Sequence, residues 1–275
     1  MNPIPFSKMS GTGNDFIIID NRDRIVENDG LAEFIRKVCR RKMSVGADGL
    51  ILIESSDKAD FRWRFFNSDG SPAEMCGNGA RCAARFAYLN GIAAENLSFE
   101  TEAGIIKGQV KNGSAMVKIP DPTDLRLDYS LDLENGPLTV SSVNTGVPHV
   151  VVMMDSVEAV DVFGLGREIR YYGAFAPSGT NVNFICRQKS GQLAIRTYER
   201  GVENETLACG TGAIASALVA SCKTNWTSPI SLVTRSEELL TIHFRESNGV
   251  FTDVYLEGDA RMIYIAELRE DAWKS

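Results

Sequence analysis

The chain has 275 residues, of which 44% are hydrophobic and 24% charged, and its net charge is −7 at pH 7. This is the composition of a globular protein with enough length for two modest domains. The negative charge argues against a nucleic-acid-binding protein, since such proteins usually carry a basic surface. No stretch is apolar for long enough to cross a bilayer, and the first residues lack the apolar segment of a signal peptide, so we expect a cytoplasmic protein bound to neither nucleic acid nor membrane.

Most of the chain is predicted to form short strands, because β-branched and aromatic runs alternate with Gly, Asp, Asn and Pro. In chain order these strands are 16–20, 50–53, 61–66, 97–101, 115–119, 149–154, 182–186, 193–198, 231–235, 240–244, 251–256 and 262–268.

Four helices are predicted, over 30–42, 78–89, 156–170 and 211–222. The first and third carry charged faces and are expected to be peripheral. The fourth is apolar or small on every side, which indicates a helix buried all round.

The sequence contains an internal repeat, CGNGA at 76–80 and CGTGA at 209–213, offset by 133 residues. Each copy follows a predicted strand and loop, and each opens a predicted helix. A weaker echo relates GTGNDFI (11–17) to GTNVNFI (179–185). The repeat predicts an α+β protein of two pseudo-symmetric domains, each a strand-rich sheet or barrel wrapped around a central helix. We place the domains at 1–118 plus 262–275 and at 119–261.

Both repeats place a cysteine, Cys76 or Cys209, at the start of a helix. Unpaired backbone N–H groups and the helix dipole lower the pKa of a cysteine thiol in such a position. The glycines that follow let a ligand approach the backbone, whose N–H groups can hold a carboxylate. Two such turns predict two thiols facing each other across a cleft, which suits inversion of a stereocentre by one base and one acid. The helix termini would stabilise the developing negative charge without a metal or a cofactor.

The remaining cysteines are interpreted as small buried hydrophobic residues, namely Cys39, Cys82, Cys186 and Cys222. Six cysteines scattered over a long chain are typical of thiols in a reducing compartment. With no CxxC pair and only two histidines, a metal site is not expected.

Five motifs carry a resemblance to a known family over essentially the whole chain. They are GTGNDF (11–16), GADG (46–49), FFNSDGSPAEMCGNGARC (65–82), GTNVNF (179–184) and YERGVENETLACGTGA (198–213). The sequence resembles the diaminopimelate epimerases. The resemblance implies a homodimer that interconverts L,L- and meso-2,6-diaminopimelate without a cofactor, for lysine and peptidoglycan synthesis.

The resemblance also implies roles for single residues. Cys76 and Cys209 would be the acid/base pair, with His149 the partner of Cys76 and Glu199 the partner of Cys209. Four residues would bind the distal end of the substrate: Asn14, Asn67, Asn183 and Arg200. Four others would hold the reacting carboxylate and amine: Gly77, Asn78, Gly210 and Thr211. Asp48 in GADG is expected to be structural, and so is His243.

Two features depart from the family pattern. Val147 stands where many members have an asparagine that binds substrate, and a valine side chain cannot form a hydrogen bond. The loop from Glu199 to Cys209 is one residue longer than in many members, which could shift Glu199.

Three other functions stay open. The first is a racemase or epimerase of another amino acid, such as glutamate, proline or hydroxyproline, which Val147 would permit. The second is a thiol redox protein, although the CxxC spacing is missing. The third is a dinucleotide-binding module, for which GTGNDF is weak support because it lacks the third glycine and precedes a strand.

Overall fold

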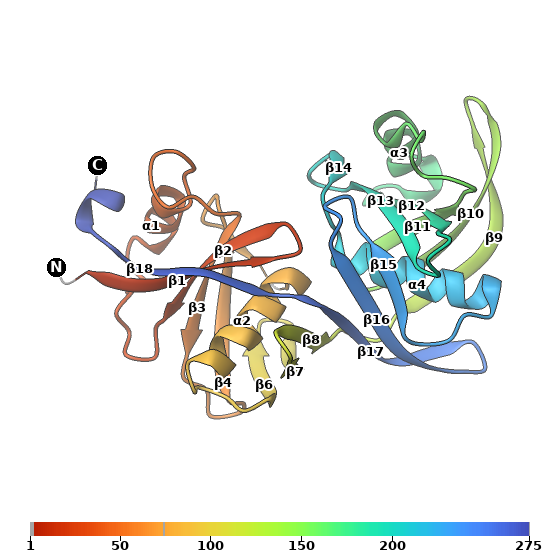
Figure 1. Cartoon of the computed structure of the whole chain (residues 1–275). Coiled ribbons are helices and arrows are strands. Elements are labelled where there is room, and N and C mark those ends of the chain that lie inside the picture. The colour runs from red at the N-terminus through yellow and green to blue at the C-terminus, as the bar shows by residue number, and fades with distance from the viewer. Residues whose placement is uncertain (1–2, 74, 275) are drawn as a thin grey trace. The chain divides into compact units, whose positions relative to one another are not determined.

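The computed structural model describes residues 3–73 and 75–274, so Glu74 of the first cysteine motif lies outside the described residues. The chain divides into two compact units, one comprising Met1–Val117 and Gly258–Ser275, the other Lys118–Glu257. Figure 1 shows the strands and helices of each unit.

The first unit is built on one run of paired strands. β18 pairs antiparallel with β1, and the run continues through β2, β3, β4, β6, β7 and β8. The β2–β3 and β4–β6 pairs are parallel, the others antiparallel, and short β5 also pairs with β4. The strands are β1 (Ile4–Gly11), β2 (Asn14–Asp20), β3 (Gly49–Glu54), β4 (Phe61–Asn67), β5 (Pro72–Ala73), β6 (Asn96–Thr101), β7 (Gly104–Lys111), β8 (Ser114–Lys118) and β18 (Arg261–Leu268).

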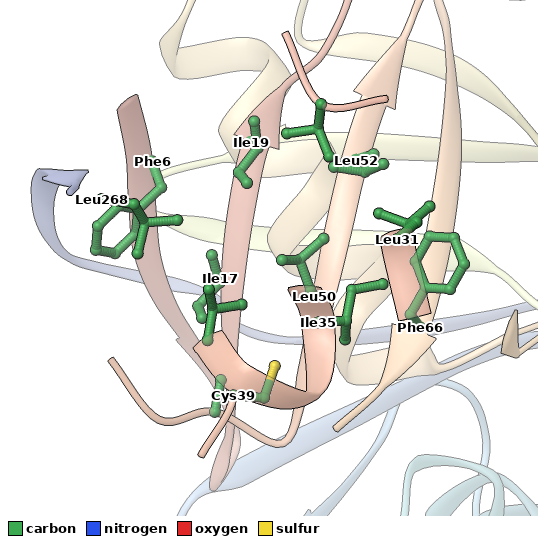
Figure 2. Close-up of a cluster of buried hydrophobic side chains, with 13 residues drawn as sticks. Phe6, Ile17, Ile19, Leu31, Ile35, Cys39, Leu50, Leu52, Phe66 and Leu268 are labelled. Carbon is green, nitrogen blue, oxygen red and sulfur yellow. The ribbon is translucent and has the colours of Figure 1, made fainter. Parts of the chain in front are cut away.

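Two helices pack on these strands. α2 (Gly77–Leu89) contacts β1, β2, β3 and β7. α1 (Leu31–Val38) packs on the other side of β2 and β3, where its Leu31 and Ile35 meet Ile17 and Leu50 in the cluster of Figure 2. Because successive side chains of a strand point to opposite faces, β2 and β3 are covered on both faces, and this explains their continuous apolar sequences.

The second unit repeats this topology. The strands pair in the order β10, β11, β12, β13, β15 and β16, which corresponds to β1, β2, β3, β4, β6 and β7 of the first unit. The β11–β12 and β13–β15 pairs are parallel, and short β14 also pairs with β13. β9 takes the place of β18 beside the first strand of the run. The strands are β9 (Thr123–Leu133), β10 (Gly136–Asn144), β11 (Pro148–Met153), β12 (Asn181–Arg187), β13 (Leu193–Glu199), β14 (Asn204–Thr206), β15 (Ile230–Val233), β16 (Leu239–Ser247) and β17 (Val250–Asp259).

The helices of the second unit are placed as in the first. α4 (Gly210–Thr224) contacts β10 to β13, β15 and β16, and α3 (Val162–Arg170) covers β12, β13 and β14. The prediction of an α+β protein with two pseudo-symmetric halves, each wrapped around a helix, is confirmed.

Some element boundaries differ from prediction. The helix predicted over 30–42 is α1, which ends at Val38, and that over 156–170 is α3, which begins only at Val162 because the Asp161 carboxylate caps it by accepting from Gly164 N at 2.9 Å. Six strands were not predicted, namely β1, β5, β7, β9, β10 and β14. Of these, β9 is largely exposed, and its charged residues interrupt any apolar run. Within the part of the chain that the structure describes, no helix is both long and apolar enough to span a membrane.

Candidate active site

Both repeated cysteines are the N-cap residues of central helices. Cys76 precedes α2 with an extended backbone (φ −146°, ψ 114°), and Cys209 precedes α4 in nearly the same conformation (φ −127°, ψ 111°). The Cys76 Sγ accepts from Gly79 N at 3.4 Å, and the Cys209 Sγ lies 3.5 Å from the Thr211 hydroxyl. Cys76 is half-buried and Cys209 is buried. Each thiol therefore sits at the positive end of a helix whose first N–H groups have no helical partner.

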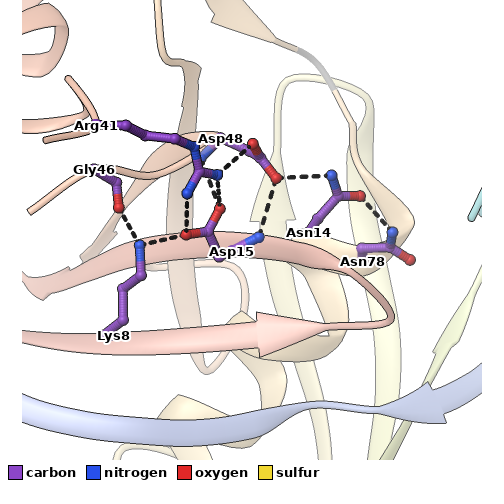
Figure 3. Close-up of polar contacts among 7 residues, drawn as sticks. All are labelled: Lys8, Asn14, Asp15, Arg41, Gly46, Asp48 and Asn78. Atoms are coloured by element: carbon purple, nitrogen blue, oxygen red, sulfur yellow. Dashed lines mark hydrogen bonds and ion pairs between the residues drawn. The ribbon is translucent and has the colours of Figure 1, made fainter. Parts of the chain in front are cut away.

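Two predicted substrate-binding asparagines of the first unit touch each other. Asn78, in the first turn of α2, donates from Nδ2 to Asn14 Oδ1 at 2.6 Å, and Asn14 donates from Nδ2 to Asp48 Oδ2 at 3.0 Å (Figure 3). The Asn78 Oδ1 in turn accepts from Arg81 Nη2 at 2.9 Å. The two amides are thus held in a continuous chain of hydrogen bonds.

Charged residues bind the Asp48 end of this chain of hydrogen bonds. Asp48 accepts from Arg41 Nη2 at 2.9 Å, and Arg41 also binds Asp15. Lys8 forms a 2.6 Å ion pair with Asp15 and donates to the Gly46 carbonyl (Figure 3). Hydrogen bonds and charge from Arg41 and Lys8 outweigh burial and lower the pKa of Asp15, which stays ionised. Asp48 thus joins Arg41 to Asn14.

Two further predicted residues of the first unit lie outside the amide chain. Asn67 ends β4 in an exposed position and donates to Ser71 Oγ at 3.1 Å. Its side chain forms no hydrogen bond with the side chains of Asn14 or Asn78. Gly77 is the first residue of α2, half-buried beside Cys76.

In the second unit the structure brings together His149 and Asn183. Asn183 is fully buried on β12, and its Nδ2 donates to His149 Nδ1 at 3.1 Å and to the Val150 carbonyl at 3.0 Å. Thr197 donates to Asn183 Oδ1 at 3.0 Å, so both ends of the amide are fixed. Nδ1 of His149 is therefore an acceptor, and the proton of the neutral ring is on Nε2. Nε2 is buried, and the described residues offer it no hydrogen-bond partner.

Burial, aided by the positive charge of Arg200, lowers the pKa of His149 to about 3. The imidazole is consequently neutral at physiological pH. Its Nε2–H is a hydrogen-bond donor.

Glu199 and Arg200 follow each other at the end of β13. Burial raises the pKa of Glu199, and a 2.9 Å hydrogen bond from Thr206 opposes that shift. The Arg200 backbone N–H donates to Asn181 Oδ1 at 2.9 Å, and its Nη1 donates to the Ser178 carbonyl at 3.3 Å. Within the described part of the chain the bond to Ser178 is the one hydrogen bond of the Arg200 guanidinium, which has five N–H donors.

The first turn of α4 packs tightly on this cluster. Gly210 and Thr211 are half-buried, and Thr145 donates to the Thr211 carbonyl at 3.2 Å. A Cβ on Gly212 would lie 2.2 Å from Asn183 Oδ1, so only glycine lets β12 and α4 approach this closely. Among residues 3–73 and 75–274, no group of three or more His, Cys, Asp or Glu side chains could hold a metal ion.

One residue at the amide chain was missed by sequence reasoning. Arg81 is fully buried in α2, although an arginine is ordinarily exposed. Its position inside an otherwise small and apolar helix sequence, NGARCAARFA, was the available signal.

The fold is shared with several solved structures. A PhzF-family phenazine biosynthesis protein of Bacillus anthracis superposes with a TM-score of 0.75 at 15% identity, covering 98% of this chain and 100% of that one. A probable proline racemase from Agrobacterium radiobacter gives a TM-score of 0.69 at 13% identity, covering 97% and 93%. The chain thus shares its two-unit α+β fold with these structures.

Sequence comparison gives the family. Residues 6–120 and 141–263 match the family model described as diaminopimelate epimerase. The diaminopimelate epimerase of Aquifex aeolicus is 46% identical, covering 97% of this chain and 98% of its own length, and that of Archaeoglobus fulgidus is 41% identical, covering 97% and 96%. The chain belongs to the diaminopimelate epimerase family and is an isomerase.

Proposed function

We propose that the protein converts L,L-2,6-diaminopimelate to the meso form by cofactor-independent proton transfer between two thiols, in lysine and peptidoglycan synthesis. The observation that carries this proposal is the equivalent placement of Cys76 and Cys209, each the N-cap of the central helix in its own unit. Membership of the family supports the substrate.

Inversion at the α-carbon needs a base on one face and an acid on the other. One cysteine thiolate removes the α-proton and becomes a thiol, while the other thiol gives its proton to the opposite face and becomes a thiolate. The electron pair left on the α-carbon is delocalised into the carboxylate. The N–H groups that begin α2 and α4, at Gly77, Asn78, Gly210 and Thr211, would hold that carboxylate, and a side-chain oxygen of the same turns would accept from the amine.

His149 and Glu199 are proposed as the partners of Cys76 and Cys209 respectively. The neutral His149 Nε2–H can donate a hydrogen bond to a thiolate but is a poor base, since its pKa is about 3. The raised pKa of Glu199 favours a carboxyl group that can carry a proton.

The distal amino-acid end of the substrate is assigned to Asn14, Asn67, Asn183 and Arg200. Arg200 suits a carboxylate, because a guanidinium can donate two parallel hydrogen bonds. Asn183 donates both its N–H groups within the protein, so direct substrate contact would use its Oδ1 or replace one of these bonds.

The proposal is tested by proton NMR in D₂O with reduced protein and no added cofactor. L,L-diaminopimelate should lose its α-proton signal and the meso form should appear, while L-glutamate and L-proline stay unchanged. Exchange of no substrate would remove the catalytic interpretation of both cysteines.

Val147 is the observation that favours a second candidate, a racemase or epimerase of glutamate, proline or hydroxyproline. The two are separated by Arg200→Ala. Loss of the distal carboxylate contact should reduce turnover of diaminopimelate far more than turnover of a monocarboxylic amino acid. Equal losses would contradict the distal role of Arg200.

We further propose a cytoplasmic homodimer. Ile263 and Ile265 of β18 are 52% and 71% exposed, and an exposed apolar strand is a ready interface with a second copy of the chain. Light scattering after size exclusion should give twice the chain mass, and Ile265→Asp should lower it. A monomeric wild-type protein would refute this.

A further inference from the structure

Arg81 is a buried cation whose hydrogen-bonding capacity is incompletely satisfied. Its Nη2 donates to Asn78 Oδ1 at 2.9 Å and to Thr12 Oγ1 at 2.7 Å, and its Nε makes a long 3.5 Å contact with the Asp259 carbonyl. Nη1 is buried and has no hydrogen-bond partner among the residues that the structure describes. Burial of a guanidinium has a desolvation cost, and these hydrogen bonds offset only part of it.

Among the residues that the structure describes, no acidic side chain forms an ion pair with Arg81. The Asp259 carboxylate pairs with Arg261. Cys82 is fully buried, and burial raises the pKa of its thiol to about 12, so it is neutral. Arginine does not lose its proton in proteins, so Arg81 stays charged although burial lowers its pKa.

The place of this charge on the helix adds to its cost. Arg81 lies five residues after the N-cap, but its guanidinium reaches back to Asn78 in the first turn, where the positive end of the helix is unfavourable for a cation. The residues whose negative charge would act favourably on Arg81 are Cys82, Cys76 and Asp259. With Cys82 neutral and Asp259 paired elsewhere, Cys76 is the group among residues 3–73 and 75–274 whose ionisation would offset the buried charge.

We propose that Arg81 is a positioning residue of the thiol site, whose buried charge favours the thiolate of Cys76 and holds the Asn78 amide ready to bind an anion. The part that concerns a bound substrate rests on the proposed function. The part that concerns Cys76 does not.

The amide orientations follow from the same guanidinium. Because Arg81 donates to Asn78 Oδ1, the Asn78 Nδ2 must be the atom that donates to Asn14 Oδ1. Asn14 then gives one N–H to Asp48, so each amide retains one uncommitted N–H. Both amides thus present donors, which fit a carboxylate and disfavour an ammonium group.

The test measures alkylation of Cys76 by iodoacetamide against pH, followed by mass spectrometry of the peptide that carries it. Arg81→Gln can keep a donor to Asn78 but removes the charge, whereas Arg81→Lys keeps the charge. Arg85→Gln is the matched control, since Arg85 lies one turn further along α2 and donates to the Ala260 carbonyl at 2.5 Å. We expect Arg81→Gln to slow Cys76 alkylation near neutral pH by about tenfold and to move the midpoint of the profile to higher pH, as loss of a nearby opposite charge does.

Arg81→Lys and Arg85→Gln should stay within about threefold of the wild-type rate, because both leave a cation at position 81. A folded Arg81→Gln protein with the wild-type profile would overturn the proposal. If that variant does not fold, a folded Arg81→Lys protein with a tenfold slower rate would overturn it as well. A shifted profile in a protein whose wild type does not epimerise diaminopimelate would sink the proposed function and leave the assignment of Arg81 intact.

Discussion

The buried neutral imidazole of His149 predicts a specific dependence of stability on pH. The pKa of His149 is about 3 in the folded protein, and that of an unfolded histidine is about 6.5. Between these values the unfolded chain binds a proton that the folded chain does not, so the free energy of unfolding falls as the pH falls. The full stability is present above about pH 6.5, and the loss grows by about 1.4 kcal/mol per pH unit below it.

Between about pH 7.5 and about pH 5 the free energy of unfolding should fall by roughly 2 kcal/mol. This is about 1.4 kcal/mol per pH unit over the roughly 1.5 units that separate pH 5 from the unfolded pKa. His149→Gln keeps an oxygen that can accept from Asn183 but does not titrate, so it should lack this component. Urea unfolding of both proteins at the two pH values measures the difference, and subtraction removes the contributions of the other groups. His243→Gln is the control, because His243 is a partly exposed residue of β16, 2.6 Å from Glu257. Equal pH dependence in the wild type and His149→Gln would refute the assignment of His149 as buried and neutral.

Two further predictions concern the helix starts. Cys76→Ser and Cys209→Ser should each abolish steady epimerisation in the NMR assay, because a serine hydroxyl at a helix N-terminus is far less acidic than a thiol, and near-normal turnover in either variant would contradict the two-base mechanism. Gly212→Ala should destabilise the protein by about 1–3 kcal/mol in thermal melts through overpacking, because the new methyl group would displace Asn183. The matched control Gly173→Ala should be nearly neutral, because no neighbouring atom lies within 4 Å of the added methyl group.

The sequence was sufficient for the fold class because its evidence is local and repeated. The two CGxGA motifs indicated where α2 and α4 begin, and the apolar composition of 211–222 indicated a helix buried all round, as α4 is. The ends of helices and the exposed strands were harder to predict from the sequence. The start of α3 depends on a single Asp161 cap, and β9 has the composition of a solvated segment because its pairing with β10 leaves most of it exposed.

The site divides in the same way. The sequence singled out the two cysteines because each is followed directly by the glycines of its motif. The family resemblance supplied His149 and Glu199 as their candidate partners. Only the tertiary structure placed Asn78 against Asn14, joined the Asn183 amide to His149, and buried Arg81 with no ion-pair partner among the described residues. The first two contacts join residues 64 and 34 positions apart, and their energies depend on burial and on the hydrogen-bond partners of each group. A local pattern determines which helix a side chain begins or belongs to, whereas its protonation and its partners are set by the strands that fold around it.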